Sequence, residues 1–143
     1  MGRIIYVDTG FLIALFDPND GLSLTAHRLL SAFRSDERVR LALPWDVINE
    51  FLAHFSRRGS ETRKLVARFI RTTLRDGKYI VENVDLSVYT TALDLYEQRL
   101  DKRYSMVDCI GMTIMRREGI SEVVTTDRDF VQEGFLNLMG RTA

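Results

Sequence analysis

The chain has 143 residues, 45% of them hydrophobic, so it can form one domain with a sizeable core and has little room for two. Its 20 basic and 20 acidic side chains balance, which argues against a strongly basic protein that coats nucleic acid but allows a nucleic-acid enzyme with a local basic patch. One cysteine excludes an internal disulfide and favours a reducing compartment.

Two further features lead us to expect a cytoplasmic protein that forms a single domain over residues 1–143. The apolar run before Asp8 is too short for the core of a signal peptide. No apolar run approaches the roughly 20 residues that span a bilayer, so we expect no membrane association.

The predicted elements alternate between strands and helices. Short runs of β-branched and aromatic residues predict strands, and apolar residues at helical spacing predict helices, with Gly, Pro, Asp and Ser between them. In chain order we expect strand 4–7, helix 9–16, helix 25–33, strand 39–43, helix 45–57, a helix from 60 to about 75, strand 79–81, helix 86–100, helix 106–118, strand 123–125 and a short strand at 135–138. This order predicts an α/β fold with a mainly parallel sheet and helices on both faces.

Two of the predicted strands lead into acidic residues. Strand 4–7 ends at Asp8, and strand 123–125 leads to Asp127, with Asp129 two residues further on. Ligands of open α/β sheets bind beyond the carboxyl ends of the strands, so these acids point to a site there. An Asp after a strand can also simply cap the next helix.

Two other acids lie in predicted helices. Glu50 stands beside the apolar stripe of helix 45–57, where it could equally be an ordinary exposed glutamate. Asp108 follows Ser105 by three residues, a spacing close to the capping box, in which two side chains satisfy free backbone N–H groups. Val107 and Cys109 nevertheless predict burial of Asp108, and a buried charge needs a partner.

Acids that converge in a partly dry cleft repel one another unless a cation binds there. Mg²⁺ and Mn²⁺ prefer carboxylate oxygens and water. A zinc site is not expected, because one cysteine and the separated His27 and His54 do not supply the usual ligands. The acidic residues therefore predict a site for Mg²⁺ or Mn²⁺.

Four motifs along the chain resemble those of PIN-domain nucleases, most closely the VapC-type toxins of toxin–antitoxin pairs. They are Val7-Asp8-Thr9, Asn49-Glu50-Phe51-Leu52, Ser105-Met106-Val107-Asp108-Cys109 and Thr125-Thr126-Asp127-Arg128-Asp129-Phe130. The resemblance spans nearly the whole chain. It implies a three-layer α/β/α sandwich with a parallel sheet and an endoribonuclease that depends on Mg²⁺ or Mn²⁺.

The resemblance also implies roles and partners. Asp8, Glu50, Asp108 and Asp127 match the catalytic, metal-binding acids, and Asp129 matches a more variable metal-binding position. In the hypothesis that follows, Asp8 is the central ligand, Asp108 and Asp127 complete the shell, and Glu50 orients or deprotonates the attacking water. The expected partners are an RNA substrate, a small antitoxin and a second copy of the chain in a homodimer.

One departure from the family pattern concerns Gly10, because many members carry a small polar side chain two residues after the first acid. Thr9 or Thr126 could substitute for that side chain. Gly10 also argues against a phosphatase of the haloacid-dehalogenase type, which needs a second Asp at this position. A receiver-like domain would need a central acceptor Asp that the chain lacks, and a PIN-like module that binds without catalysis stays an alternative.

Two groups of basic residues could contact the phosphates of a substrate. Lys64, Arg68, Arg71 and Arg75 form one stripe on the helix that begins at residue 60. Arg99, Lys102 and Arg103 come just before Ser105 and hence approach Asp108. For both groups the alternative is an ordinary solvated surface.

Overall fold

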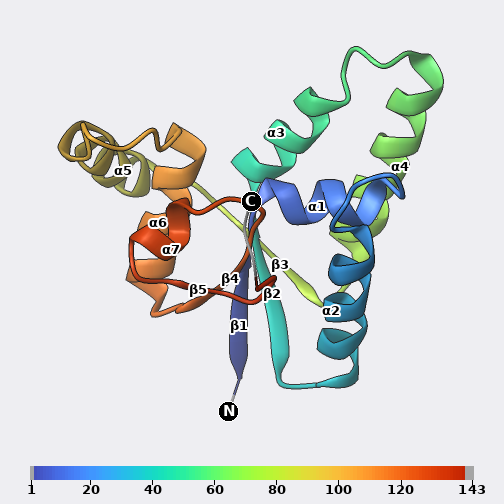
Figure 1. Ribbon diagram of the computed structural model, residues 1–143, viewed down its shortest axis with the longest axis horizontal. Helices are drawn as coiled ribbons and strands as arrows, with labels where there is room; N and C mark the ends of the chain where they lie inside the picture. Colours follow the sequence, from blue (N-terminus) through green and yellow to red (C-terminus); the bar gives the residue numbers. More distant parts are fainter. Residues whose placement is uncertain (1, 141–143) are drawn as a thin grey trace.

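In the computed structural model, which describes residues 2–140, helices cover both faces of a five-stranded sheet (Figure 1). The strands are β1 (Arg3–Val7), β2 (Val39–Pro44), β3 (Tyr79–Glu82), β4 (Glu122–Val124) and β5 (Leu136–Asn137). The helices are α1 (Thr9–Phe16), α2 (Ser23–Ser35), α3 (Trp45–His54), α4 (Ser60–Arg75), α5 (Leu86–Gln98), α6 (Met106–Glu118) and α7 (Asp129–Gln132). The predicted three-layer α/β/α architecture is confirmed.

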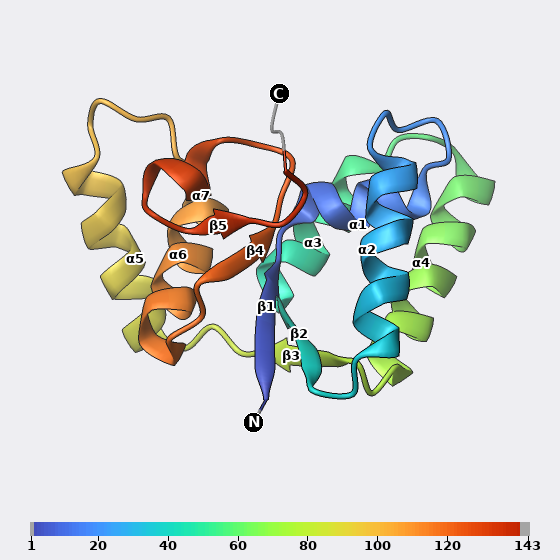
Figure 2. The same ribbon diagram turned by 60° about the horizontal axis from the view of Figure 1, so that its bottom comes forward.

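The sheet has the strand order β3-β2-β1-β4-β5, and every neighbouring pair is parallel. The central strand β1 pairs Tyr6 with Ala42 of β2 on one side and with Val123 of β4 on the other. The carboxyl ends of the strands therefore lie at one edge of the sheet. The first residues of α1 and the loop after β4 both leave from this edge (Figure 2).

Alternate residues of β1 pack into opposite layers because side chains alternate along a strand. Ile5 and Val7 belong to a cluster with residues of α1, α2, α3 and α4. Tyr6 belongs to a second cluster with residues of α5, α6 and α7. All three side chains are fully buried, so β1 is covered on both faces and gives the residue after it, Asp8, a fixed position.

The differences from the predicted elements are local. The predicted helix 45–57 ends at His54, because the Ser56 hydroxyl and the Ser56 N–H both donate to the carbonyl of Ala53 and form a turn. The helix α7 was not predicted, because four residues are too few to show a helical period. Within residues 2–140, no helix is long and apolar enough to cross a membrane.

Candidate metal centre

Three acidic side chains from distant parts of the sequence meet at the carboxyl end of β1. Asp8 follows β1, Asp108 lies in the first turn of α6, and Asp127 lies in the loop after β4. One carboxylate oxygen from each lies within 4.8 Å of those from the other two. Asp8 and Asp108 are buried and Asp127 is half-buried, so the cluster opens towards solvent at Asp127.

Asp8 is held by the backbone of β4 and by one hydroxyl group. Its N–H donates to the carbonyl of Val124 at 3.1 Å, and Thr125 Oγ1 donates to Asp8 Oδ2 at 2.7 Å. Asn137 fixes Thr125 by accepting from its N–H and donating to its carbonyl. Although Asp8 occupies the N-cap position of α1, its side chain makes no capping hydrogen bond, so capping does not explain this residue.

Asp108 caps its helix and belongs to the acidic cluster as well. Ser105 Oγ accepts from the N–H of Asp108 at 3.1 Å, and Asp108 Oδ2 accepts from the N–H of Ser105 at 3.0 Å, which completes a capping box. The two interpretations of this residue are therefore compatible. The box fixes the carboxylate in the orientation that brings it to Asp8 and Asp127.

The loop after β4 presents two acids. The N–H of Asp127 donates to Thr125 Oγ1 at 3.3 Å, and Asp127 Oδ1 accepts from the N–H of Asp129 at 3.0 Å. Burial and the charge of Asp8 are the main causes of the raised pKa of Asp108, and the Asp129 side chain lies close enough to add to it. Asp129 therefore lies beside the three-acid cluster, next to Asp108.

Glu50 lies at the exposed margin of the same cluster. Its carboxylate comes from α3 and accepts a hydrogen bond from Thr9 Oγ1, which belongs to the first turn of α1. Its charge contributes to the raised pKa values of Asp8 and Asp127. The structure thus brings Asp8, Asp108 and Asp127 together directly, with Glu50 near Asp8 and Asp127 and with Asp129 near Asp108 and Asp127.

The cluster is strained electrostatically in the absence of a cation. Burial, with added repulsion from Asp127 and Glu50, raises the pKa of Asp8 to about 7 against the opposing hydrogen bond from Thr125. Burial and the charge of Asp8 raise the pKa of Asp108 to about 8. Burial also raises the pKa of Asp127. Each buried carboxylate disfavours ionisation of its neighbours, and a bound divalent cation would offset this repulsion.

The residues present fit a hard divalent cation. All the side-chain donors are carboxylate oxygens, the donor type that Mg²⁺ and Mn²⁺ prefer. Asp8, Asp108 and Asp127 would hold the ion, and the solvent-facing side at Asp127 would leave positions for water or phosphate. Cys109 is buried in the core between α5, α6 and the sheet and offers no soft alternative.

Sequence reasoning missed two residues that hold Asp8 and one buried acid beside Glu50. Thr125 and Asn137 hold Asp8, but nothing in the local sequence indicates a partner that lies 117 residues away from it along the chain. Asp46 precedes Glu50 by one helical turn, and burial raises its pKa to about 6 with a contribution from Glu50. The spacing of Asp46 and Glu50 on one helix face was the available signal for Asp46.

The position of Gly10 has a spatial substitute. A Cβ atom at Gly10 would lie 2.0 Å from Thr126 Oγ1, so the Thr126 side chain occupies the volume that a side chain at position 10 would need. Thr9, the other candidate substitute, donates to Glu50 instead. The chain therefore carries the small hydroxyl side chain on the loop after β4 rather than on α1.

Gly10→Ser is expected to destabilise the protein by about 1–3 kcal/mol, because the added atoms collide with Thr126. Adding Thr126→Ala should recover part of this loss, because it removes the two nearest atoms but leaves the Thr126 Cβ atom at 2.8 Å, and a double-mutant cycle of urea unfolding measures the coupling. Gly21→Ser is the matched control, because a Cβ atom there has no atom within 4 Å. Additive effects of the changes at Gly10 and Thr126 would contradict the shared-volume explanation.

The basic residues differ in their availability. Lys64, Arg68, Arg71 and Arg75 are all exposed on α4, and Lys64 Nζ also lies 3.4 Å from Glu61. In the second group, Arg99 is bound to the carboxylate of Glu133 at 2.9 Å, and Lys102 Nζ lies 3.5 Å from Asp101. The stripe on α4 is therefore better placed than Arg99 to contact a polyanion.

The fold is shared with known proteins. Residues 5–136 match the family model of the PIN domain. The structure is similar to VapC20 of Mycobacterium tuberculosis, a toxin that cleaves the sarcin–ricin loop, with a TM-score of 0.82 and 25% identity over 94% of this chain and 98% of that one.

Two more distant structures share the fold. VapBC2 of Rickettsia felis bound to a promoter DNA fragment has a TM-score of 0.70 at 12% identity, over 94% of this chain and 96% of that one. FitAcB of Neisseria gonorrhoeae has a TM-score of 0.68 at 12% identity, over 93% of this chain and 94% of that one. No curated protein sequence matches at a significant level. Because the family model spans nearly the whole chain, the chain belongs to the PIN-domain family, as its motifs predicted.

Proposed function

We propose that residues 1–143 act as one nuclease domain, a divalent-metal-dependent endoribonuclease that serves as the toxin of a toxin–antitoxin pair in the cytoplasm. The observation that carries the proposal is the meeting of Asp8, Asp108 and Asp127 at the carboxyl end of the central strand of a PIN fold. The likeness to VapC20, a toxin that cleaves the sarcin–ricin loop, supports RNA as the substrate.

The proposed catalytic and metal-binding residues are Asp8, Glu50, Asp108 and Asp127, with Asp129 as a further metal-binding residue. A bound Mg²⁺ or Mn²⁺ would neutralise phosphate charge and lower the pKa of water. Thr125 and the capping box keep two of the ligands fixed before the ion arrives. Glu50 is exposed and its carboxylate accepts a hydrogen bond from Thr9, and in this proposal it would orient or deprotonate the attacking water.

The test is RNA cleavage by protein purified free of any antitoxin, with Mg²⁺, Mn²⁺ or EDTA. We expect cleavage with either metal, none with EDTA, and a loss of roughly 100-fold or more in Asp8→Asn and Asp108→Asn. Asp94→Asn is the matched control, because Asp94 is an exposed acid on α5 outside the cluster. Equal cleavage by the wild type and the two cluster variants would reject the proposal.

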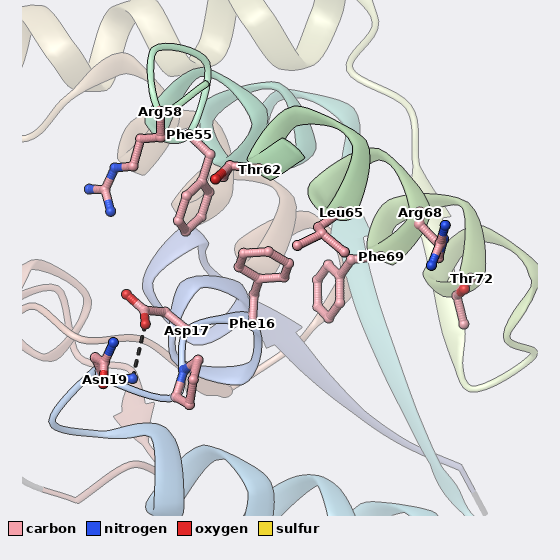
Figure 3. Close-up of a pocket in the computed structure, with 11 residues that line it drawn as sticks. Phe16, Asp17, Asn19, Phe55, Arg58, Thr62, Leu65, Arg68, Phe69 and Thr72 are labelled. Atoms are coloured by element: carbon pink, nitrogen blue, oxygen red, sulfur yellow. Dashed lines mark hydrogen bonds between the residues drawn. The ribbon is translucent and has the colours of Figure 1, made fainter. Parts of the chain in front are cut away.

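A groove between the end of α1 and helix α4 supports the proposed antitoxin partner. It has a volume of about 620 Å³, and Phe16, Phe69 and Leu65 line it while Arg58 and Arg68 project at its two ends (Figure 3). Its apolar surface between two cations suits a segment with apolar side chains flanked by acidic ones. Toxin–antitoxin complexes are among the structures that share this fold.

The proposed homodimer is supported by an apolar stripe on the outer face of α5, which lies at one side of the molecule with α6 between it and the sheet (Figure 2). The stripe consists of Leu86, Tyr89, Leu93 and Tyr96 on α5, continued by Leu100 just beyond the end of the helix, and these side chains are between 43% and 85% exposed. Spacings of three and four residues place them on one helical face, the pattern of a helix that pairs with another. Asp85 begins the stripe and Arg103 follows its end, so antiparallel pairing of two copies would bring opposite charges together.

Sedimentation at micromolar concentrations should therefore show a dimer for the wild type and a monomer for Leu93→Glu. The matched control is Leu24→Glu, because Leu24 is 63% exposed on α2, away from the stripe. A dimer that survives Leu93→Glu would place the interface elsewhere.

A further inference from the structure

Glu133 joins three donors at the end of α7. Its side chain is only 6% exposed. The carboxylate accepts hydrogen bonds from Arg99 Nε at 2.9 Å, from the Tyr104 hydroxyl at 2.9 Å and from Arg116 Nη2 at 2.7 Å. These donors, Arg99 foremost, hold the pKa of Glu133 at about 2, so the carboxylate is ionised at all physiological pH values.

The three donors come from three different segments. Arg99 ends α5, Tyr104 lies in the loop before α6, and Arg116 lies in the last turn of α6. Arg116 also stacks over the ring of Phe135, 5.3 Å from its centroid. The carboxylate therefore ties the end of α7 to α6. The two helices lie side by side in both ribbon views (Figures 1 and 2).

The segments that meet at Glu133 carry two of the three acids of the cluster. Tyr104 immediately precedes Ser105, whose capping box fixes Asp108. Glu133 closes the segment that begins at Asp127 and contains Asp129. Glu133 is not one of the clustered acids, but its hydrogen bonds join the end of this segment to Tyr104, just before α6, and to Arg116 within α6.

We propose that Glu133 is a positioning residue for the metal centre: its charge holds the loop of Asp127 and Asp129 against α6 and so preforms the acidic cluster. The inference rests on the proposed metal site. The carboxyl groups of Asp108 and Asp127 meet within 4.8 Å across these two segments, so ionisation of both without a cation would push the segments apart. A buried ionic clamp between the same segments opposes that repulsion, whereas a neutral amide would satisfy fewer of the donors.

The test is Mn²⁺ binding to the full chain, measured from the electron paramagnetic resonance signal of free Mn²⁺. Glu133→Gln is expected to weaken binding by about 10-fold or more, the scale of losses caused by removing groups that orient metal ligands. Asp76→Asn is the matched control, because it weakens an ion pair of similar length. Asp76 lies 2.8 Å from Arg34 of α2, on the other side of the sheet from Glu133. This substitution should leave Mn²⁺ affinity within about twofold even where it lowers the melting temperature equally.

Two further measurements keep the outcomes distinct. Tyr104→Phe removes one donor and leaves the charges, so it should fold and weaken Mn²⁺ binding by a smaller factor. In the metal-free protein, hydrogen exchange in residues 127–134 should be faster in Glu133→Gln than in Asp76→Asn. Wild-type affinity in both Glu133→Gln and Tyr104→Phe overturns the positioning role. If the wild type binds no Mn²⁺, or if Asp8→Asn binds Mn²⁺ with the affinity of the wild type, the proposed metal site is wrong.

Discussion

Mn²⁺ is expected to raise the melting temperature of this protein strongly at about pH 8 and weakly at about pH 5, while the metal-free protein loses stability over the same interval. Asp8 and Asp108 have folded-state pKa values of about 7 and about 8, well above the unfolded value of about 3.9. The folded state therefore holds these protons more tightly. Stability is greatest where the carboxyls are protonated and falls as pH rises through the folded pKa values.

The size of the effect follows from the shift. A rise in the pKa of Asp8 from about 4 to about 7 corresponds to roughly 4 kcal/mol of unfolding free energy, which is lost once the buried carboxyl is ionised. Glu133 and Asp36 have lowered pKa values of about 2 and act in the opposite direction, but only below the unfolded values near pH 4. Between about pH 5 and pH 8 the raised carboxyls consequently dominate.

Thermal unfolding in EDTA and in Mn²⁺ across this interval checks the prediction. The difference between the two curves should widen with pH, because protons and the cation compete for the same carboxylates. Asp8→Asn should make the EDTA profile shallower, while Asp108, Asp46 and Glu82, whose pKa values burial also raises, keep a residual slope. Metal-free stability that rises from pH 5 to pH 8 would show that the acids do not share one site.

Much of this fold follows from local pattern, and the site follows less completely. Strands such as 4–7 are predictable because β-branched residues between turns have few alternatives, and the strand ends then indicate Asp8 and Asp127. The four-residue α7 is not predictable, because its first turn depends on the Asp127 side chain rather than on an apolar period.

The support of the site depends on contacts between distant segments. Thr125 bonds Asp8 across neighbouring strands, and Glu133 bonds Arg99 and Tyr104 across three elements. No local spacing predicts such pairs. Asp108 illustrates the limit differently: its sequence fits a helix cap and a metal ligand, and in the structure one carboxylate takes part in both arrangements.

Asp8→Asn should abolish Mn²⁺ binding and RNA cleavage and yet make the metal-free protein more stable at about pH 8. At that pH the wild type carries an ionised Asp8 buried beside Asp108 and Asp127. The Asn side chain has the same shape, its carbonyl oxygen can still accept from Thr125 Oγ1, and it adds no charge. We expect a gain of about 1–3 kcal/mol in urea unfolding, below the full shift because Asp108 then ionises more readily.

The opposite signs separate a metal ligand from a structural acid. Thr125→Val is the matched control: it removes the donor to Asp8 and leaves the charge, so it should lower both stability and Mn²⁺ affinity. If Asp8 served only to hold β1 and β4 together, replacing it by Asn should destabilise the protein, as the loss of a paired acid does. Destabilisation by Asp8→Asn with Mn²⁺ binding intact would therefore remove Asp8 from the centre of the site, whereas greater stability with lost binding is the pattern of an acid kept for the cation.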